Sequence, residues 1–364
     1  METAVSGILL YLAEEQGKGK TVRHISPGLR RGATPRKGKR KWQKHKDIKF
    51  IHPNMFPETK LNVLKKDDEE FYFNENLKPG HKKYLLINPP IVDTKYFAEG
   101  WRVPTTGILR VAHYLIDNGD KINFYDFEPY YHIKLEHKLS LGGKNDLYLY
   151  GKPMDDFVAY IKNLQDKNID EIFITAIITF HYPHVILQEL VDNIREVFGD
   201  TKITFGGLYP SLCPDEIKKL GVEIHNGPYY SADSYRPLIE LTNENEYAVM
   251  RVVKGCPRTC SYCVVPNVEG RILTHYQKEN IIKQFHEFYS MGFTTFKFWD
   301  SNLLFGRENL YILMDYLIKY GYTDSIFLDF SYGLEFSLVD DDFINRINQF
   351  TLRNPLFVPR IIRI

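Results

Sequence analysis

The sequence predicts an α/β protein in which a doubly wound parallel sheet is followed by part of a barrel of β–α units. Two observations predict this class. Short apolar runs alternate with segments of helical period from residue 82 to the end. Gly and Pro residues separate these runs, and no run is long enough to span a membrane. Strands that alternate with helices form parallel sheets with right-handed crossovers.

The first domain is expected over residues 82–245. Its predicted strands are the apolar runs at 84–87, 122–126, 172–177, 202–205 and 222–224. Helices are predicted at 105–119 and 187–198, and 128–153 is expected to be a long loop or insertion. Ligands of such a sheet bind beyond the carboxyl ends of its strands.

The second domain is expected over residues 246–364. The predicted strands are 248–253, 294–299, either 326–330 or 332–336, and 356–364. Predicted helices at 279–292, 310–320 and 339–347 separate them. About four β–α units of roughly 30 residues fit in this length. Because the last strand has no closing helix, we expect the sequence to be a fragment of a longer barrel.

Residues 1–81 are expected to be a basic, disordered segment. Lys and Arg crowd the stretch 18–46, which has no acidic residue. A solvated tail and an arm that binds nucleic acid both fit this charge run. The net charge of the whole chain is only +1, so the molecule as a whole suggests neither a nucleic-acid nor a membrane partner. No secretory signal is recognised, which predicts a cytoplasmic protein.

Three cysteines lie within eight residues, in the order Cys256, Cys260 and Cys263. Three thiolates at this spacing can hold one compact inorganic centre, whereas a cubane 4Fe–4S cluster usually takes four. With three ligands, one iron stays open to a substrate or cofactor. The alternative is a structural zinc site, which needs a fourth ligand such as Cys213 or His275. A disulfide framework does not fit this crowding.

The pattern C-x-x-x-C-x-aromatic-C, with Tyr262 before the last cysteine, resembles the signature of the radical SAM superfamily. This resemblance implies a radical SAM barrel and a 4Fe–4S cluster on Cys256, Cys260 and Cys263. The cluster would reductively cleave S-adenosylmethionine to a 5′-deoxyadenosyl radical. In that family, Tyr262 would lie near the adenine, and Asp300 and Asn302 would bind the S-adenosylmethionine. Asp300 could equally cap a helix. No catalytic residue is assigned.

The first domain resembles the Rossmann-like cobalamin-binding domain that precedes many radical SAM barrels. The matching pieces are Leu86-Ile87-Asn88-Pro89-Pro90 and the run from Gly206 to Ser211. Paired glycines let the backbone approach a flat corrin closely. The resemblance implies cobalamin contacts from Thr105, Thr179, Gly206, Gly207 and Tyr209. The family's D-x-H-x-x-G motif is absent, so cobalt would have no protein histidine. A domain that keeps the fold without cobalamin is the alternative.

These resemblances imply a transferase, with cobalamin-dependent methyl transfer as the reaction and flavodoxin or ferredoxin as the reductant. A methylthiotransferase is a second possibility, although that family carries three further cysteines and only Cys213 remains here. A non-catalytic, zinc-stabilised module with a nucleic-acid-binding arm is the third. The substrate is not predicted.

Overall fold

The structure is a computed structural model that describes residues 61–66, 69–74, 82–94, 105–127, 132–134, 147–164, 168–177, 183–242, 247–330 and 334–350. Thr259–Cys263 does not belong to the compact unit formed by the other described residues. The stretches 1–60 and 351–364 lie outside the described residues, and so do the basic run and the strand expected at 356–364.

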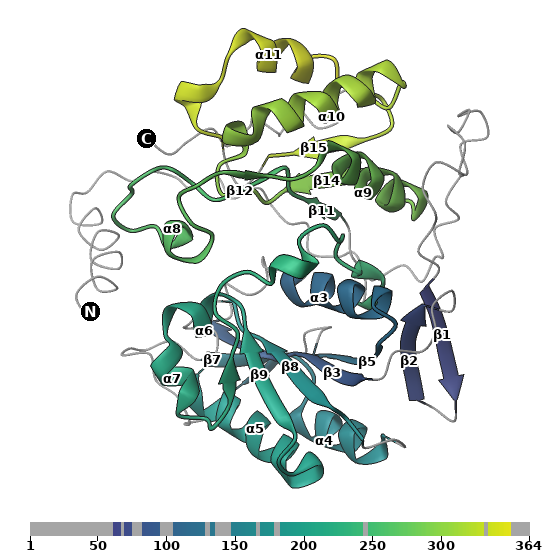
Figure 1. Ribbon diagram of the computed structural model, residues 1–364, viewed down its shortest axis with the longest axis vertical. Helices are drawn as coiled ribbons and strands as arrows, with labels where there is room; N and C mark the ends of the chain where they lie inside the picture. Colours follow the sequence, from purple (N-terminus) through teal and green to yellow (C-terminus); the bar gives the residue numbers. More distant parts are fainter. Residues whose placement is uncertain are drawn as a thin grey trace. The chain divides into compact units, whose positions relative to one another are not determined.

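The first domain is built on a sheet with the strand order β1-β2-β5-β3-β8-β9-β10 (Figure 1). Five of these strands run parallel: β3 (Lys83–Asn88), β5 (Lys121–Asp126), β8 (Glu171–Thr175), β9 (Lys202–Gly206) and β10 (Glu223–Ile224). The parallel sheet predicted from the sequence is therefore confirmed.

Helices cover both faces of this sheet. In Figure 1, α3 (Thr106–Asp117) lies on one face, and α4 (Met154–Asn163) and α5 (His184–Phe198) lie on the other. The side chains of β3 alternate between two cores: Leu85 and Ile87 join the core of α4 and α5, whereas Tyr84 and Leu86 join that of α3. A strand buried on both faces is apolar throughout, which explains the continuous run in the sequence.

Two features of this domain differ from the sequence prediction. A hairpin of β1 (Leu61–Lys66) and β2 (Glu69–Asn74) pairs antiparallel with β5, so the sheet begins before residue 82 and includes part of the segment expected to be disordered. The expected loop at 128–153 contains β6 (His132–Lys134) and β7 (Leu147–Tyr150). These strands form a small antiparallel sheet with β4 (Ile91–Thr94).

Short elements follow β9 and lead to the second domain. They are α6 (Leu208–Leu212), α7 (Pro214–Lys218), η4 (Tyr230–Ala232) and η5 (Ile239–Leu241). Arg236, in this connection, is buried and ion-paired with Glu240 and Glu287 at 2.6 and 3.0 Å. Its carbonyl oxygen lies 3.0 Å from Nδ1 of His113 on α3. The connection is thereby fixed both to α3 and to the second domain.

The second domain has a parallel sheet of β11 (Ala248–Met250), β14 (Thr295–Phe298) and β15 (Phe327–Asp329). The helices α9 (Lys278–Ser290), α10 (Arg307–Lys319) and α11 (Asp341–Ile347) pack with it. The three β–α units match the prediction. The predicted strand at 248–253 is interrupted, however, because β12 (Val253–Lys254) pairs antiparallel with β13 (Thr274–His275) instead.

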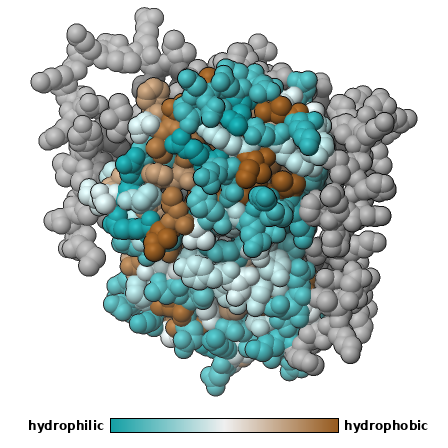
Figure 2. Space-filling model, turned by 45° about the horizontal axis from the view of Figure 1, so that its top comes forward, coloured by the Kyte–Doolittle hydropathy of each residue, from teal (hydrophilic) through white to brown (hydrophobic). Residues whose placement is uncertain are grey.

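The two domains share one hydrophobic core. Leu109 and Ala112 of α3 belong to the same buried cluster as Met250 of β11 and Phe298 of β14. Figure 2 shows that apolar residues on the visible face form separate patches within a hydrophilic surface, as is ordinary for globular proteins. Among the described helices, none is long and apolar enough to cross a bilayer.

Candidate functional site

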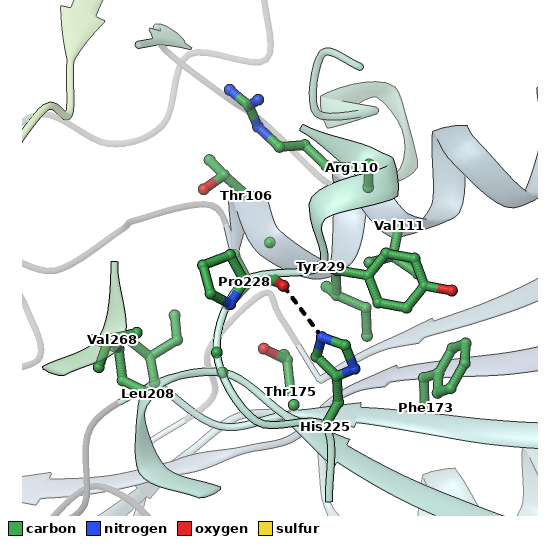
Figure 3. Close-up of a pocket in the computed structure, with 18 of the residues that line it drawn as sticks. Thr106, Arg110, Val111, Phe173, Thr175, Leu208, His225, Pro228, Tyr229 and Val268 are labelled. Carbon is green, nitrogen blue, oxygen red and sulfur yellow. Dashed lines mark hydrogen bonds between the residues drawn. The ribbon is translucent and has the colours of Figure 1, made fainter. Parts of the chain in front are cut away.

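A cavity of about 850 Å3 is lined by residues at the carboxyl ends of both parallel sheets and extends along the face of β8, β9 and β10 (Figure 3). From the first sheet it is lined by Thr175 after β8, Gly206 at the end of β9 and His225 after β10. From the second domain it is lined by Arg251 and Asp300, among others. Strand ends are where both sheet types are expected to bind ligands, so this cavity is the candidate functional site.

The two neighbouring glycines at the cavity, Gly206 and Gly207, differ in why a side chain is absent. Gly206 lines the cavity, and a Cβ built there would meet no atom within 4 Å. Gly207 has φ +107°, and a Cβ there would lie 2.4 Å from the carbonyl oxygen of Ala176. The chain itself thus requires glycine at 207, whereas at 206 the open space faces the cavity.

Asp300 lies at the end of β14 and is buried, with 2% of its surface exposed. Its Oδ1 accepts hydrogen bonds from the backbone N–H groups of Val252 and Val253, at 2.8 and 2.7 Å. These bonds hold the interruption between β11 and β12. Asp300 therefore caps no helix, and its second carboxylate oxygen is buried in the cavity wall without a hydrogen-bond partner.

Burial raises the pKa of Asp300 to about 6, against the effect of Arg251 and of the two backbone bonds, which lower it. A buried acid with a raised pKa keeps its proton longer than it does in the unfolded chain. The contribution of Asp300 to the free energy of unfolding is therefore fully present below the pKa that the group has in the unfolded chain. This contribution is lost as the pH rises through about 6. The Asp300→Asn variant has no such loss, and its amide oxygen can still accept the two bonds.

We expect the stability of Asp300→Asn, relative to the wild type, to improve by about 1–2 kcal/mol between pH 5 and pH 7.5. Urea unfolding at the two pH values measures this. The matched control is Asp215→Asn, whose side chain is 91% exposed. Equal pH dependence in the wild type and Asp300→Asn would show that the carboxylate is not buried as described.

The start of the cysteine loop (256–263), at Gly255 and Cys256, is held by hydrogen bonds to the chain that follows the loop. Oε2 of Glu269 accepts from the N–H of Gly255 at 3.2 Å, and the N–H of Cys256 donates to the carbonyl oxygen of Gly270 at 3.2 Å. Arg251 donates to the same Glu269 oxygen at 2.8 Å. Burial acts to raise the pKa of Glu269, but Arg251 and these hydrogen bonds outweigh it, so the pKa lies below its usual range. Glu269 is consequently an ionised anchor for the loop.

Further buried charges line the cavity. Lys254 is ion-paired with Asp233, and the Arg110 guanidinium lies over the ring of Tyr276 at 5.7 Å. Burial lowers the pKa of Arg110 and of Lys254, although Asp233 opposes the shift in both, and it raises that of Tyr276. Sequence reasoning missed these residues. One signal in the sequence could have indicated buried charges here: Arg251 and Lys254 interrupt an otherwise apolar run.

The described cysteines are all free thiols. Cys256 directly follows Gly255 after β12 and is buried, with 8% of its surface exposed. In the separate segment Thr259–Cys263, Cys260 is exposed, Cys263 is half-buried, and the Cys263 N–H donates to the Cys260 carbonyl oxygen at 3.2 Å. Within the described parts of the chain, no three His, Cys, Asp or Glu side chains are placed to hold a metal ion. The three-cysteine ligand set therefore stays a prediction.

No protein-family model matches the sequence. Curated relatives include the ribosomal protein uS12 methylthiotransferases RimO of Chlorobium limicola and Nostoc punctiforme. The first is 26% identical over 117 residues, which is 32% of this chain and 23% of the relative. The second is 26% identical over 123 residues, or 34% and 27% of the two chains. The match thus spans about a quarter of the length of these relatives.

Two solved structures of TsrM from Kitasatospora setae, a radical S-adenosylmethionine methyltransferase, share the fold. One contains cobalamin and a 4Fe–4S cluster; it has a TM-score of 0.55 at 12% identity and covers 74% of this chain and 59% of that chain. The other contains tryptophan and a SAM analogue, with a TM-score of 0.57 at 13% identity and 74% and 57% coverage. The chain thus shares its fold with TsrM and, over about a third of its length, resembles the RimO proteins in sequence.

The other residues expected to serve a radical SAM enzyme have different surroundings. Asn302 donates to Glu335 at 2.7 Å, and its own amide oxygen is buried without a partner. Tyr262, in the separate segment, is 74% exposed. Tyr209 packs in the core of the first domain and does not line the cavity. Thr105 lines the cavity, and Thr179 lies outside the described residues.

Proposed function

We propose that this chain is the cofactor-binding part of a radical SAM methyltransferase, in which a 4Fe–4S cluster is held by Cys256, Cys260 and Cys263. One observation carries the proposal: a single cavity joins the carboxyl ends of both sheets, directly beside the anchored base of the cysteine loop. A cofactor bound by the first sheet and one bound by the second would meet in this space.

Three cysteines could supply the donors of the cluster, because their free thiols lie within eight residues of the chain. The N–H of Cys256 is bonded to Gly270, next to the cavity-lining Glu269. Three thiolates would hold such a cluster and leave one of its irons open for S-adenosylmethionine. When bound, the cluster supplies the electron that breaks the sulfonium C–S bond. Flavodoxin or ferredoxin is the proposed source of that electron.

The chain's own residues would hold the cysteine loop in place and bind S-adenosylmethionine. Glu269 and Gly270 hold the start of the cysteine loop, and Asp300 fixes the strand before it. The free oxygen of Asp300 is the proposed acceptor for the ammonium group of S-adenosylmethionine, because a buried carboxylate oxygen without a donor favours a cation.

Cobalamin fits the first-domain side of the cavity. Gly206 leaves open space there, and the wall holds the apolar and aromatic side chains Val111, Phe173 and Tyr229 (Figure 3). His225 also lines the cavity, and its Nε2 lies 3.3 Å from the carbonyl oxygen of Pro228. We propose that this side of the cavity would hold cobalamin, which would supply the methyl group. Because the D-x-H-x-x-G motif is absent from the sequence, we expect no protein histidine on cobalt.

The test is anaerobic reconstitution with iron and sulfide, followed by metal analysis, equilibrium dialysis with hydroxocobalamin, and assay of 5′-deoxyadenosine after reduction with dithionite. We expect one 4Fe–4S cluster and one corrinoid per chain, and 5′-deoxyadenosine from S-adenosylmethionine. Zinc in place of iron would support the zinc-stabilised module instead.

A methylthiotransferase is the second candidate, because the curated sequence relatives that match are RimO proteins. That reading predicts a reconstituted cluster without any corrinoid binding. The same dialysis therefore distinguishes it from the methyltransferase. The expected nucleic-acid contact through residues 18–46 lies outside the described residues and stays a prediction.

A further inference from the structure

The start of α3 opens onto the cavity with a hydroxyl group that the helix does not use. Thr105 occupies the N-cap position, but its side chain makes no capping hydrogen bond. It is buried, with 6% of its surface exposed, and Oγ1 has no hydrogen-bond partner. Thr105, Thr106 and Gly107 all line the cavity. A buried hydroxyl without a partner is costly, so its presence here indicates a missing ligand.

The same end of α3 favours an anion. The first N–H groups of a helix have no partner within the helix, and the helix dipole adds positive potential there. Space is available, because a Cβ at Gly107 would meet no atom within 4 Å. One and a half turns into the helix, the buried guanidinium of Arg110 also lines the cavity and donates to the Asp233 carbonyl oxygen at 2.9 Å.

The carboxylates around the cavity are mostly neutralised. Glu269 pairs with Arg251, Asp233 with Lys254, and Glu171 with Lys202 at 2.8 Å. Asp300 has one free oxygen and is close enough to raise the pKa of Arg110, but burial of Arg110 is the larger effect. An anion at the start of α3 would therefore find a guanidinium and free N–H donors with little opposing charge.

We propose that Thr105, the first turn of α3 and Arg110 form a subsite for the phosphate of a nucleotide-bearing cofactor. The inference rests on the proposed function, since cobalamin carries such a phosphodiester in its nucleotide tail. The neighbouring wall of Val111, Phe173 and Tyr229 is apolar and aromatic, which suits the heterocycle attached to that phosphate (Figure 3). The hydroxyl of Thr105 donates one hydrogen bond to a phosphate oxygen, and the helix N–H groups donate the others.

The test compares three probes in equilibrium dialysis: hydroxocobalamin, cobinamide, which has the corrin without the nucleotide and its phosphate, and ADP-ribose, which has phosphates without the corrin. We expect the wild type to bind hydroxocobalamin at least 10-fold more tightly than cobinamide. Thr105→Val should weaken hydroxocobalamin about 10-fold, the value of one hydrogen bond to a charged group, and leave cobinamide unchanged. Thr105→Ser should restore the wild-type preference.

Thr201→Val is the matched control, because its hydroxyl donates to the Phe198 carbonyl oxygen and it does not line the cavity. Equal wild-type affinity for hydroxocobalamin and cobinamide would overturn the subsite while leaving corrinoid binding intact. Equal weakening of both corrinoids by Thr105→Val would also overturn it. Binding of ADP-ribose alone, sensitive to Thr105→Val, would support the phosphate subsite and refute cobalamin as the cofactor. Binding of none of the three probes would overturn both.

Discussion

Replacing Gly207 with alanine should destabilise the protein by about 3 kcal/mol or more, whereas the same change at Gly206 should alter its stability by less than about 1 kcal/mol. At Gly207 the backbone has φ +107°, which L side chains rarely adopt, and a Cβ would lie 2.4 Å from Ala176 O. At Gly206 a Cβ would meet no atom within 4 Å. The neighbouring glycines are thus a matched pair in one turn.

Thermal and urea unfolding of the two alanine variants measures the difference. Comparable stability of the two variants would contradict the described turn after β9. Because Gly206→Ala is expected to fold, a larger residue at the same position tests the cavity: Gly206→Leu should keep its melting temperature but bind hydroxocobalamin more weakly. Gly207→Leu could not serve this purpose, since the collision with Ala176 would damage the turn itself.

This pair illustrates what the sequence could and could not establish. The two glycines after an apolar run predict a strand end and a close approach, and both are present. The sequence does not say what approaches each glycine. For Gly207 it is the backbone of Ala176, about 30 residues earlier, and only the parallel pairing of β8 with β9 brings the two segments together.

The strands and helices that were predicted well have strong local patterns. The stripe of α3 is an example, since Ile108, Leu109, Ala112, Leu115 and Ile116 are all buried as expected. The hairpin of β1 and β2 was missed because charged residues flank its short apolar runs. The interruption at Val252 was missed because Asp300, which accepts its N–H, lies 48 residues away.

In the candidate site, too, local motifs are visible in the sequence and contacts between distant residues are not. The three cysteines form a local motif and are visible in the sequence. Arg110, Asp233, Lys254 and Tyr276 come from separate elements, and their ion pairs and ring contact depend on the shared core of the two domains. No spacing in the sequence predicts that these residues surround one cavity.

Replacing Cys256, Cys260 or Cys263 with alanine should each abolish the cluster in protein reconstituted without oxygen. An iron that loses its only protein thiolate is exposed to exchange, and a cubane on two cysteines does not persist. Iron and sulfide analysis, with the visible absorption of the brown protein, measures the loss. Each variant should retain the melting temperature of the wild-type apoprotein to within a few degrees. Cys260 is exposed and Cys263 is half-buried, so their replacement removes little packing. Cys256 is buried, and its variant is expected to show the largest change in melting temperature.

Cys213→Ala is the control that makes this prediction specific. Cys213 precedes α7 and packs partly against the core of the first domain, apart from the cavity lining. Its alanine variant should keep the full content of iron and sulfide. If Cys213→Ala loses the cluster while one of the other three variants keeps it, the ligand set is wrong. Retention of zinc by all four variants would instead mean that the metal is bound elsewhere, because a structural zinc site in this loop needs these thiolates as well.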